Sequence, residues 1–231
     1  MAVQTLVDEE FGEITIHRIK TARHIKIGLH VNGQLRATMP PFAPKRLLRQ
    51  LVHSSRESIR TLLAENSSTS MYQHGDAVGK THSLLFTRGT QLGSKRQKNV
   101  IVITIPLRLE ETAPAVQQLV REEVIKALRK EAKNYLPQRL AMIASEYGYT
   151  YKKVRLSHAS TRWGSCSSSG TISLNIALMK LPYELIEYVL VHELCHTKEL
   201  NHSKQFWQLV AMADPDYKAH VKIMKTHSPT I

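Results

Sequence analysis

Alternating apolar and polar residues predict a β-rich beginning for the chain. Five stretches have the pattern of strands with a buried face: residues 13–20, 25–31, 34–39, 81–88 and 99–105. Asn32-Gly33 joins the second stretch to the third, and this dipeptide favours a two-residue hairpin turn. Residues 89–98 hold three basic side chains, and we interpret them as a basic loop between the last two strands.

Two stretches have the apolar periodicity of helices, one between these strands and a longer one after them. Apolar residues recur on one face from residue 47 to residue 63, so a helix should begin at Pro44 and end near Leu63. A longer helical pattern covers residues 114–147, and Gly148 favours a stop after it. Pro137 lies inside this pattern and should kink or interrupt the helix, because proline removes an amide donor.

The C-terminal part alternates short strands and helices. Strands are expected at 154–158 and 171–176, and Pro182 should open a helix that is apolar on nearly every side. Ser203 should cap a last helix, which Asp214-Pro215-Asp216 ends. A helix without a polar face is expected to be buried in the core.

Charge is the one unusual bulk property. The chain has 231 residues, of which 42% are hydrophobic, enough for one large or two small domains. Lys and Arg number 32 against 19 Asp and Glu, and the net charge of +13 favours polyanionic partners, nucleic acid first. A solvated basic surface without a partner would explain the same excess.

Nothing in the sequence points to a membrane. No apolar run approaches the ~20 residues that a membrane-spanning helix needs. The first ten residues lack the basic segment and long apolar core of a signal peptide, so we expect a cytoplasmic protein. The two cysteines, Cys166 and Cys195, exclude a disulfide framework, and Cys195 is expected to be a small buried residue.

The buried helix carries the residues of a metal site. His192 and His196 are four residues apart and therefore lie on one helix face, one turn apart, where two imidazoles can bind one zinc ion. Glu193 lies beside them, where its carboxylate can reach a metal-bound water. His202 is the candidate third ligand, provided that the chain turns after His196; Asn201 tolerates the left-handed conformation that such turns often use.

The alternative interpretation is a helix with two surface histidines. The neighbouring residues argue against it, because Val189, Leu190, Val191 and Leu194 surround the pair with apolar side chains. Imidazoles and a carboxylate inside a buried helix need polar partners, and a metal ion supplies them.

The C-terminal motifs resemble those of the YgjP-like metallopeptidases. They occur in that family's order and spacing: Arg162-Trp163-Gly164-Ser165-Cys166, Ile172-Ser173-Leu174-Asn175, Val191-His192-Glu193-Leu194-Cys195-His196, Asn201-His202-Ser203, Phe206-Trp207 and Asp214-Pro215-Asp216-Tyr217. These motifs cover residues 155–217. The N-terminal strands resemble the family more loosely, so the resemblance spans most of the chain.

The resemblance implies a zincin-like catalytic domain related to the SprT-type and WLM-type peptidases, with His192, His196 and His202 as zinc ligands and Glu193 as the general base. We therefore expect an α+β protein. A β-rich α+β part should cover residues 1–113, and a zincin-like metallopeptidase domain residues 114–231, with its HExxH helix packed on a small sheet. SprT-like relatives act on proteins crosslinked to DNA, which suggests nucleic-acid-associated protein substrates by analogy.

The expected chemistry is hydrolysis of peptide bonds. Zinc lowers the pKa of its water toward ~7, and Glu193 would take the proton and return it to the leaving amine. Four side chains are candidates to hold the carbonyl oxygen: Arg162, Tyr183, Tyr217 and His220. The strand at 171–176 is expected to pair with the substrate backbone.

A second hypothesis is a nucleic-acid-binding module whose zinc is structural or whose peptidase activity is vestigial. Glu193 favours the hydrolase, because a purely structural site has no need of it. Closed structural sites also use four protein ligands, and only three histidines are well placed here.

Overall fold

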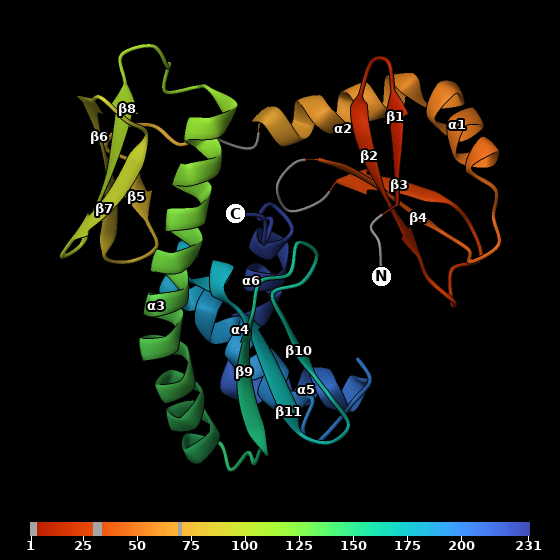
Figure 1. The fold of residues 1–231 in the computed structure, drawn as a ribbon. Helices are drawn as coiled ribbons and strands as arrows, with labels where there is room; N and C mark the ends of the chain where they lie inside the picture. The colour runs from red at the N-terminus through yellow and green to blue at the C-terminus, as the bar shows by residue number, and fades with distance from the viewer. Residues whose placement is uncertain (1–3, 30–33, 69–70) are drawn as a thin grey trace. The chain divides into compact units, whose positions relative to one another are not determined.

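The fold is α+β and consists of two compact units, Met1–Met71 and Tyr72–Ile231 (Figure 1). The structure is a computed structural model, and it describes residues 4–29, 34–68 and 71–231. The sequence predicts a boundary after residue 113. The structure places the strands of residues 77–106 in the second unit, because their apolar side chains share one core with the helix that follows them.

The second unit begins with a four-stranded sheet in the order β5-β6-β8-β7. Its strands are β5 (Ala77–Val78), β6 (His82–Gly89), β7 (Gly93–Gln97) and β8 (Val100–Pro106). The predicted basic loop at 89–98 is wrong, because half of it is β7, which pairs antiparallel with β8. The polar residues of β7 hid this strand, and charged side chains such as Lys95 are common on edge strands, where they oppose further pairing.

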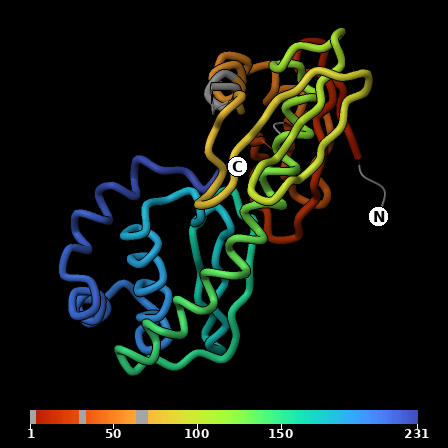
Figure 2. The backbone as a smooth tube through the Cα atoms, turned by 90° about the vertical axis from the view of Figure 1, so that its left-hand side faces the viewer, coloured from red at the N-terminus to blue at the C-terminus, as the bar shows by residue number. Residues whose placement is uncertain are grey.

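One helix, α3 (Pro114–Glu146), packs against both sheets of the second unit. Its N-terminal half contacts β5, β7 and β8, and later turns contact β9 (Lys153–Ser157), so the helix lies along both sheets (Figure 2). Of the two effects expected of Pro137, a kink or an interruption, the interruption does not occur, because the helix continues through the proline. Leu136 and Leu140, on either side of the proline, are fully buried, and this packing stabilises the helix against the missing hydrogen bond.

A three-stranded sheet lies beside the helix that carries the histidines. Its order is β10-β11-β9, with β10 (Gly164–Cys166) antiparallel and β9 parallel to the central β11 (Thr171–Asn175). A 3-10 turn, η1 (Ile176–Lys180), leads from β11 to α4 (Tyr183–Cys195), which packs against α3, β10, α5 (Lys204–Ala213) and α6 (Tyr217–Met224).

Local signals explain the ends of these elements. Asn175 accepts a hydrogen bond from the amide of Ala177 and so begins η1. Ser203 accepts one from the amide of Phe206 at 3.2 Å, which confirms it as the cap of α5. Cys195 is fully buried, as expected, and its Sγ lies 3.3 Å from the Tyr149 hydroxyl.

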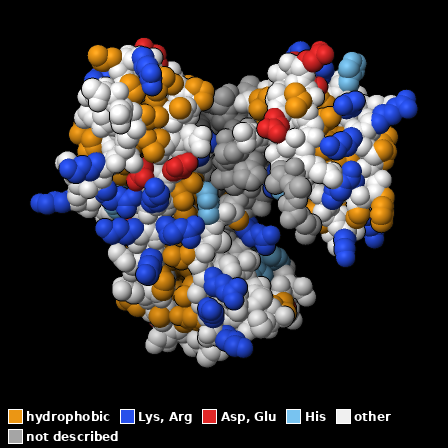
Figure 3. Space-filling model, in the orientation of Figure 1, with side chains coloured by type: hydrophobic (Ala, Val, Ile, Leu, Met, Phe, Trp, Pro, Cys, Tyr) orange, Lys and Arg blue, Asp and Glu red, His pale blue; other side chains and the backbone are white. Residues whose placement is uncertain are grey.

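Basic side chains dominate the charge of the surface. Lys and Arg side chains are visible on both units in Figure 3, with fewer Asp and Glu among them. In the described part of the chain, no helix combines the length and the apolar character that a membrane crossing requires.

The first unit is a four-stranded sheet followed by two helices. The order is β1 (Gln4–Asp8), β2 (Gly12–Arg18), β4 (Leu35–Met39), β3 (Lys26–Leu29), with β2 and β4 parallel. The predicted pairing of residues 25–31 with 34–39 is confirmed by the register Leu29↔Leu35; the Asn32-Gly33 turn lies outside the described residues.

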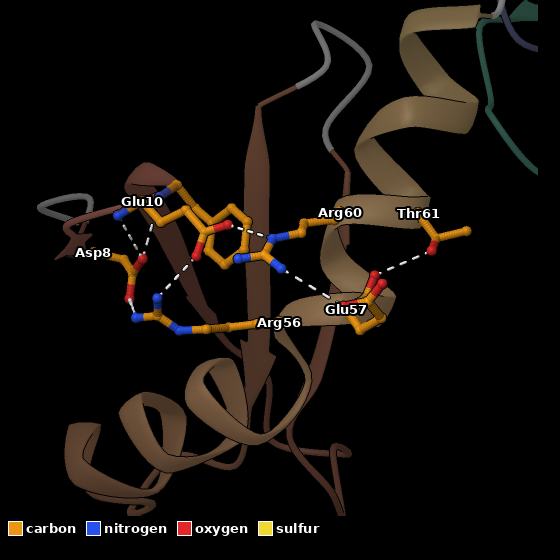
Figure 4. Close-up of polar contacts among 7 residues, drawn as sticks. Asp8, Glu10, Arg56, Glu57, Arg60 and Thr61 are labelled. Atoms are coloured by element: carbon orange, nitrogen blue, oxygen red, sulfur yellow. Dashed lines mark hydrogen bonds and ion pairs between the residues drawn. The ribbon is translucent and has the colours of Figure 1, made fainter.

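The helix predicted for residues 44–63 is two helices, α1 (Lys45–Ser54) and α2 (Arg56–Ser68), separated at Ser55. Arg56 and Arg60 of α2 bind Glu10, which follows β1, at 2.8 and 2.6 Å (Figure 4). These ion pairs attach the β1–β2 turn to α2. The apolar residues of the sheet and α1 form a separate core around Ile14 and Leu48.

Candidate metal-dependent active site

Three histidine side chains converge at the end of α4. His192 Nε2 lies 3.2 Å from His196 Nε2 and 3.1 Å from His202 Nε2, and the three candidate ligand atoms lie within 4.8 Å of one another. The first two histidines meet because they are one helical turn apart. His202 joins them from a loop, so its position depends on how the chain turns after α4.

The turn after α4 is built from hydrogen bonds rather than from a left-handed residue. The amides of Lys198 and Glu199 both donate to the carbonyl of Cys195, and the amide of Ser203 donates to the carbonyl of Asn201. Among the described non-glycine residues only Lys98 has a positive φ, so the expectation of a left-handed Asn201 is wrong. The turn brings the chain back so that α5 begins directly after His202.

Partners on the other ring nitrogen orient the imidazoles. His196 Nδ1 lies 3.0 Å from the carbonyl oxygen of Glu199, and His192 Nδ1 lies 3.5 Å from the Tyr188 hydroxyl. A carbonyl only accepts, so Nδ1 of His196 carries the proton and its Nε2 presents a lone pair. This is the tautomer that a metal ligand needs.

Aromatic rings hold the histidines in place. Phe206 is fully buried and stacks on the ring of His196, with 4.4 Å between the ring centroids. Trp207 stacks on His202, with 5.7 Å between the centroids. Tyr217 of α6 stacks in turn on Trp207 at 5.4 Å. The three rings restrict the rotamers of the histidines, so the converging nitrogens are preorganised.

Burial sets the electrostatics of the cluster. Desolvation, with a further contribution from His196 and His202, lowers the pKa of His192 to about 3, so its imidazole is neutral at pH 7. Desolvation also raises the pKa of Glu193 to about 8, and the positive charge of Arg162 opposes this shift. Glu193 Oε2 is buried and has no hydrogen-bond partner among the described residues. The neutral imidazole of His192, beside the unpartnered acidic side chain of Glu193, suits a cation.

Glycine at position 164 leaves room for the Glu193 carboxylate. A Cβ atom at Gly164 would lie 2.5 Å from Oε1 and 2.8 Å from Cδ of Glu193, closer than any side chain tolerates. The Arg162–Cys166 motif therefore contains β10 and forms the wall against which Glu193 packs.

A pocket of about 310 Å³ opens beside the histidines. Trp163, Gly164, Tyr188, His192, Glu193 and Val221 are among the residues that line it, so β10, α4 and α6 each contribute a wall. Tyr188 was not among the predicted site residues, although it is four residues before His192 and so shares its helix face. This spacing was the signal that could have found it.

The four candidate oxyanion donors lie in different places. Tyr183 lies at the opposite end of α4, where its ring contacts Tyr135 and Lys80, so it lies away from the histidines. His220 Nδ1 is 2.8 Å from Asp214, and its ring lies 6.1 Å from Tyr188. The positive charge of Arg162 acts on the carboxyl group of Glu193, and the ring of Tyr217 stacks on Trp207.

The strand expected to pair with the substrate is the wrong one. β11 has neighbours on both sides, so its backbone groups are already paired within the sheet. The edge strands are β10 and β9, and β10 is the one that packs against α4, the helix that carries the histidines. Toward β11, the carbonyl of Trp163 accepts a hydrogen bond from the amide of Asn175, and the amide of Ser167 donates one to the carbonyl of Thr171. By alternation, the backbone groups of Gly164 and Cys166 point outward, ready to pair.

A family model matches most of the chain. The model of the YgjP-like family, described as a YgjP-like metallopeptidase domain, matches residues 23–227. The chain is also similar to the metallopeptidase zymogen of Pyrococcus abyssi abylysin, whose crystal structure shares 30% identity over 39% of this chain and 92% of that chain, with a TM-score of 0.36. No curated protein matches the chain.

Proposed function

The chain belongs to the YgjP-like family of metallopeptidases, and we propose that His192, His196 and His202 bind a zinc ion at which Glu193 serves as the general base for peptide-bond hydrolysis. The single observation that carries this proposal is the convergence of three Nε2 atoms beside a buried carboxylate without a partner. It extends the family's metallopeptidase activity to a named metal and to named residues.

The donor set fits zinc. Zinc binds imidazole nitrogen at about 2.0–2.1 Å in tetrahedral sites, which places ligand nitrogens about 3.3 Å apart. Two of the three separations, 3.1 and 3.2 Å, are close to this value, and all three ligand atoms lie within 4.8 Å of one another. Imidazole ligands suit zinc better than magnesium or calcium, which prefer oxygen. Three protein ligands leave one coordination position for water or substrate, as catalytic zinc sites do.

Zinc, when bound, supplies a Lewis acid that lowers the pKa of its water toward ~7. The remaining steps belong to the chain. Glu193 accepts a proton from the attacking water and later donates it to the leaving amine. Tyr188 and the Glu199 carbonyl keep the imidazoles in their binding orientation. Gly164 has no side chain and so leaves the space that the Glu193 carboxylate occupies.

The outward-facing edge of β10 is our candidate for binding the substrate backbone. An extended peptide added there would continue the three-stranded sheet through the amides and carbonyls of Gly164 and Cys166. Gly164 also lines the pocket beside the histidines. A peptide paired with β10 therefore passes the Glu193 carboxylate, which is the position that hydrolysis requires.

A nucleic-acid-binding module with a structural or vestigial zinc site is the second candidate function. The net charge of +13 favours it. The buried Glu193 and the three-histidine set favour the hydrolase, because closed structural sites use four protein ligands. The two functions are compatible in a peptidase that acts on nucleic-acid-associated proteins. A steep loss of affinity for single-stranded DNA with rising salt supports this combination, and absence of binding at low salt excludes it.

Glu193→Gln tests the proposal directly. The amide keeps the volume of the carboxylate but cannot accept a proton, so kcat/KM for peptide hydrolysis should fall by about 10²–10⁴-fold. Metal content, measured by elemental mass spectrometry, should equal that of the wild type. Glu184→Gln is the matched control, because Glu184 is exposed in the first turn of the same helix. Hydrolysis at the wild-type rate by Glu193→Gln would show that the base is another group.

A further inference from the structure

A second hollow lies on the outer face of the β9–β11 sheet. Its volume is about 500 Å³, and its lining includes Arg155, Arg162, Ser165, Ser167, Thr171 and Ser173. None of the residues that line it is acidic, and all of them carry a polar or ionisable side chain. The hollow shares strand β10 with the active-site pocket described above.

The register of the three strands aligns this lining. Ser165 of β10 lies opposite Ser173 of β11, and Ser173 lies opposite Arg155 of β9. Side chains at directly opposed positions share one face of a sheet. The alternate residues of β11, Ile172 and Leu174, are fully buried on the inner face. The row of two hydroxyls and one guanidinium therefore faces outward.

The two arginines bring positive charge to the hollow, and neither forms a direct ion pair with a residue that the structure describes. In residues 4–29, 34–68 and 71–231, no ion pair within 4.0 Å joins Arg155 or Arg162 to an acidic side chain. Arginine stays charged at all physiological pH values. Figure 3 shows Lys and Arg side chains over this part of the second unit, with no Asp or Glu among them. Guanidinium groups and hydroxyls are both hydrogen-bond donors that suit an oxyanion.

We propose that this hollow binds an acidic side chain of the peptide substrate and gives the peptidase a preference for aspartate or glutamate near the scissile bond. The inference rests on the proposed function, in which the substrate pairs with the edge of β10. A strand added there lies about 4.8 Å beyond β10, and every second side chain of it points to the outer face. Such a side chain lies beside Ser165, with Arg162 at the end of the loop that leads into β10.

A peptide is the ligand that the position favours, rather than nucleic acid. The hollow is local and lies on the strand that packs against Glu193, so a group bound in it belongs to the chain that passes the reacting site. A nucleic-acid surface would instead follow a run of phosphates along the protein.

The test compares the cleavage profile of the wild type with that of Arg155→Gln. Both zinc-loaded proteins are incubated with a mixture of synthetic peptides, and the cleaved bonds are identified by mass spectrometry. The wild type should favour Asp or Glu at one position by about tenfold in kcat/KM over the Gln peptide. In Arg155→Gln this ratio should fall to about one, and Arg155→Glu should favour Lys at the same position.

Lys133→Gln is the control, because Lys133 is exposed on α3 and its loss removes the same charge from the same unit. It should keep the wild-type ratio. A ratio of one in the wild type, or an unchanged ratio in Arg155→Gln, would overturn the inference while leaving the peptidase proposal intact.

Failure of the peptidase proposal gives a different result, because no peptide is then cleaved by the zinc-loaded wild type. Fluorescence anisotropy still decides the inference in that case, with two labelled decapeptides that differ only in Glu against Gln. Tighter binding of the Glu peptide by the wild type than by Arg155→Gln supports the acidic site, and equal affinities overturn it. Binding of a single-stranded oligonucleotide that Arg155→Gln abolishes, without any change in peptide selectivity, would also overturn it.

Discussion

Gly164 and Glu193 are in contact across the interface between β10 and α4: the position that a Cβ atom would take on Gly164 is 2.5 Å from Glu193 Oε1. The absence of one carbon atom therefore decides where the proposed general base lies. The contact also connects the strand proposed to bind the substrate with the helix that carries the histidines.

Gly164→Ala should displace the Glu193 carboxylate and lower kcat/KM by about 100-fold, since a shift of about 1 Å in a reacting group costs this much. Metal content should stay at the wild-type level, because the methyl group meets Glu193 and not the histidines. Gly93→Ala in β7 is the control, because its Cβ meets nothing within 4 Å. Wild-type activity in Gly164→Ala would show that catalysis does not depend on the position of this carboxylate.

His202→Ala should lose metal. It removes one of three converging nitrogens, so affinity should fall by more than the 10–100-fold that the loss of an outer partner costs. Elemental mass spectrometry on protein purified without a metal-affinity tag should find about one zinc per chain in the wild type and much less in the variant. His227→Ala, a change at an exposed histidine near the C-terminus, should retain the metal. Equal zinc in both variants would remove His202 from the ligand set.

Chelation should destabilise the second unit selectively. Both tryptophans, Trp163 and Trp207, lie in this unit, so their fluorescence reports its unfolding. A metal at 1,000 times its Kd stabilises the folded state by about 4 kcal/mol. Removing it should lower Tm by about 10 °C for a domain of this size. A chelator that leaves the Tm of the wild type unchanged would contradict metal binding by the folded state, and His202→Ala should respond less than the wild type.

Glu131→Gln should destabilise the second unit in a pH-dependent way. Burial by itself would raise the pKa of Glu131. Hydrogen bonds from the amides of Lys80 and Thr81, the Thr81 hydroxyl and His82 overcome this effect and lower the pKa. A lowered folded-state pKa contributes stability above the unfolded value of 4.5, and this contribution is lost as the pH falls through the folded value.

The measurement is urea unfolding followed by tryptophan fluorescence. At pH 7 the variant should be about 2–3 kcal/mol less stable, because it breaks hydrogen bonds to a buried charged group. The difference should shrink below pH 4.5. Glu122→Gln on the exposed face of the same helix should change stability by less than 0.5 kcal/mol. A difference that persists undiminished at acid pH would mean that the charge of Glu131 is not its cause.

The convergence of His192 with His196 was predictable because it depends only on helical periodicity. The position of His202 was less predictable from the sequence. It depends on the turn, in which the Cys195 carbonyl accepts hydrogen bonds from two amides, and on the stacking of His202 on Trp207. The resemblance to the family supported His202 as the third ligand, which helical periodicity alone could not do. The metal and base roles of these residues stay predictions until the experiments above are done.

Sheet topology was the part that the sequence could not reveal. β9 pairs with β11 in parallel through the register Leu156↔Leu174, across a loop that also contains β10. Period-two patterns mark both strands but say nothing about which strand is the neighbour. The same gap in information concealed β7, whose polar residues have no period-two apolar pattern. The substrate strand was therefore placed on β11, although β11 is the central strand and β10 is the edge strand beside α4.

Helix α3 also constrains how chains of this family can change in length. At 1.5 Å and about 100° per residue, one inserted residue between Glu131 and Leu140 would rotate the following turns away from the core. An insertion of two full turns would restore the rotation but would lengthen α3 by about 10 Å. That shift would separate Lys80, whose ammonium binds the Leu181 carbonyl before α4, from its acceptor. Insertions and deletions accumulated in evolution should therefore fall in the loops and leave the length of α3 constant.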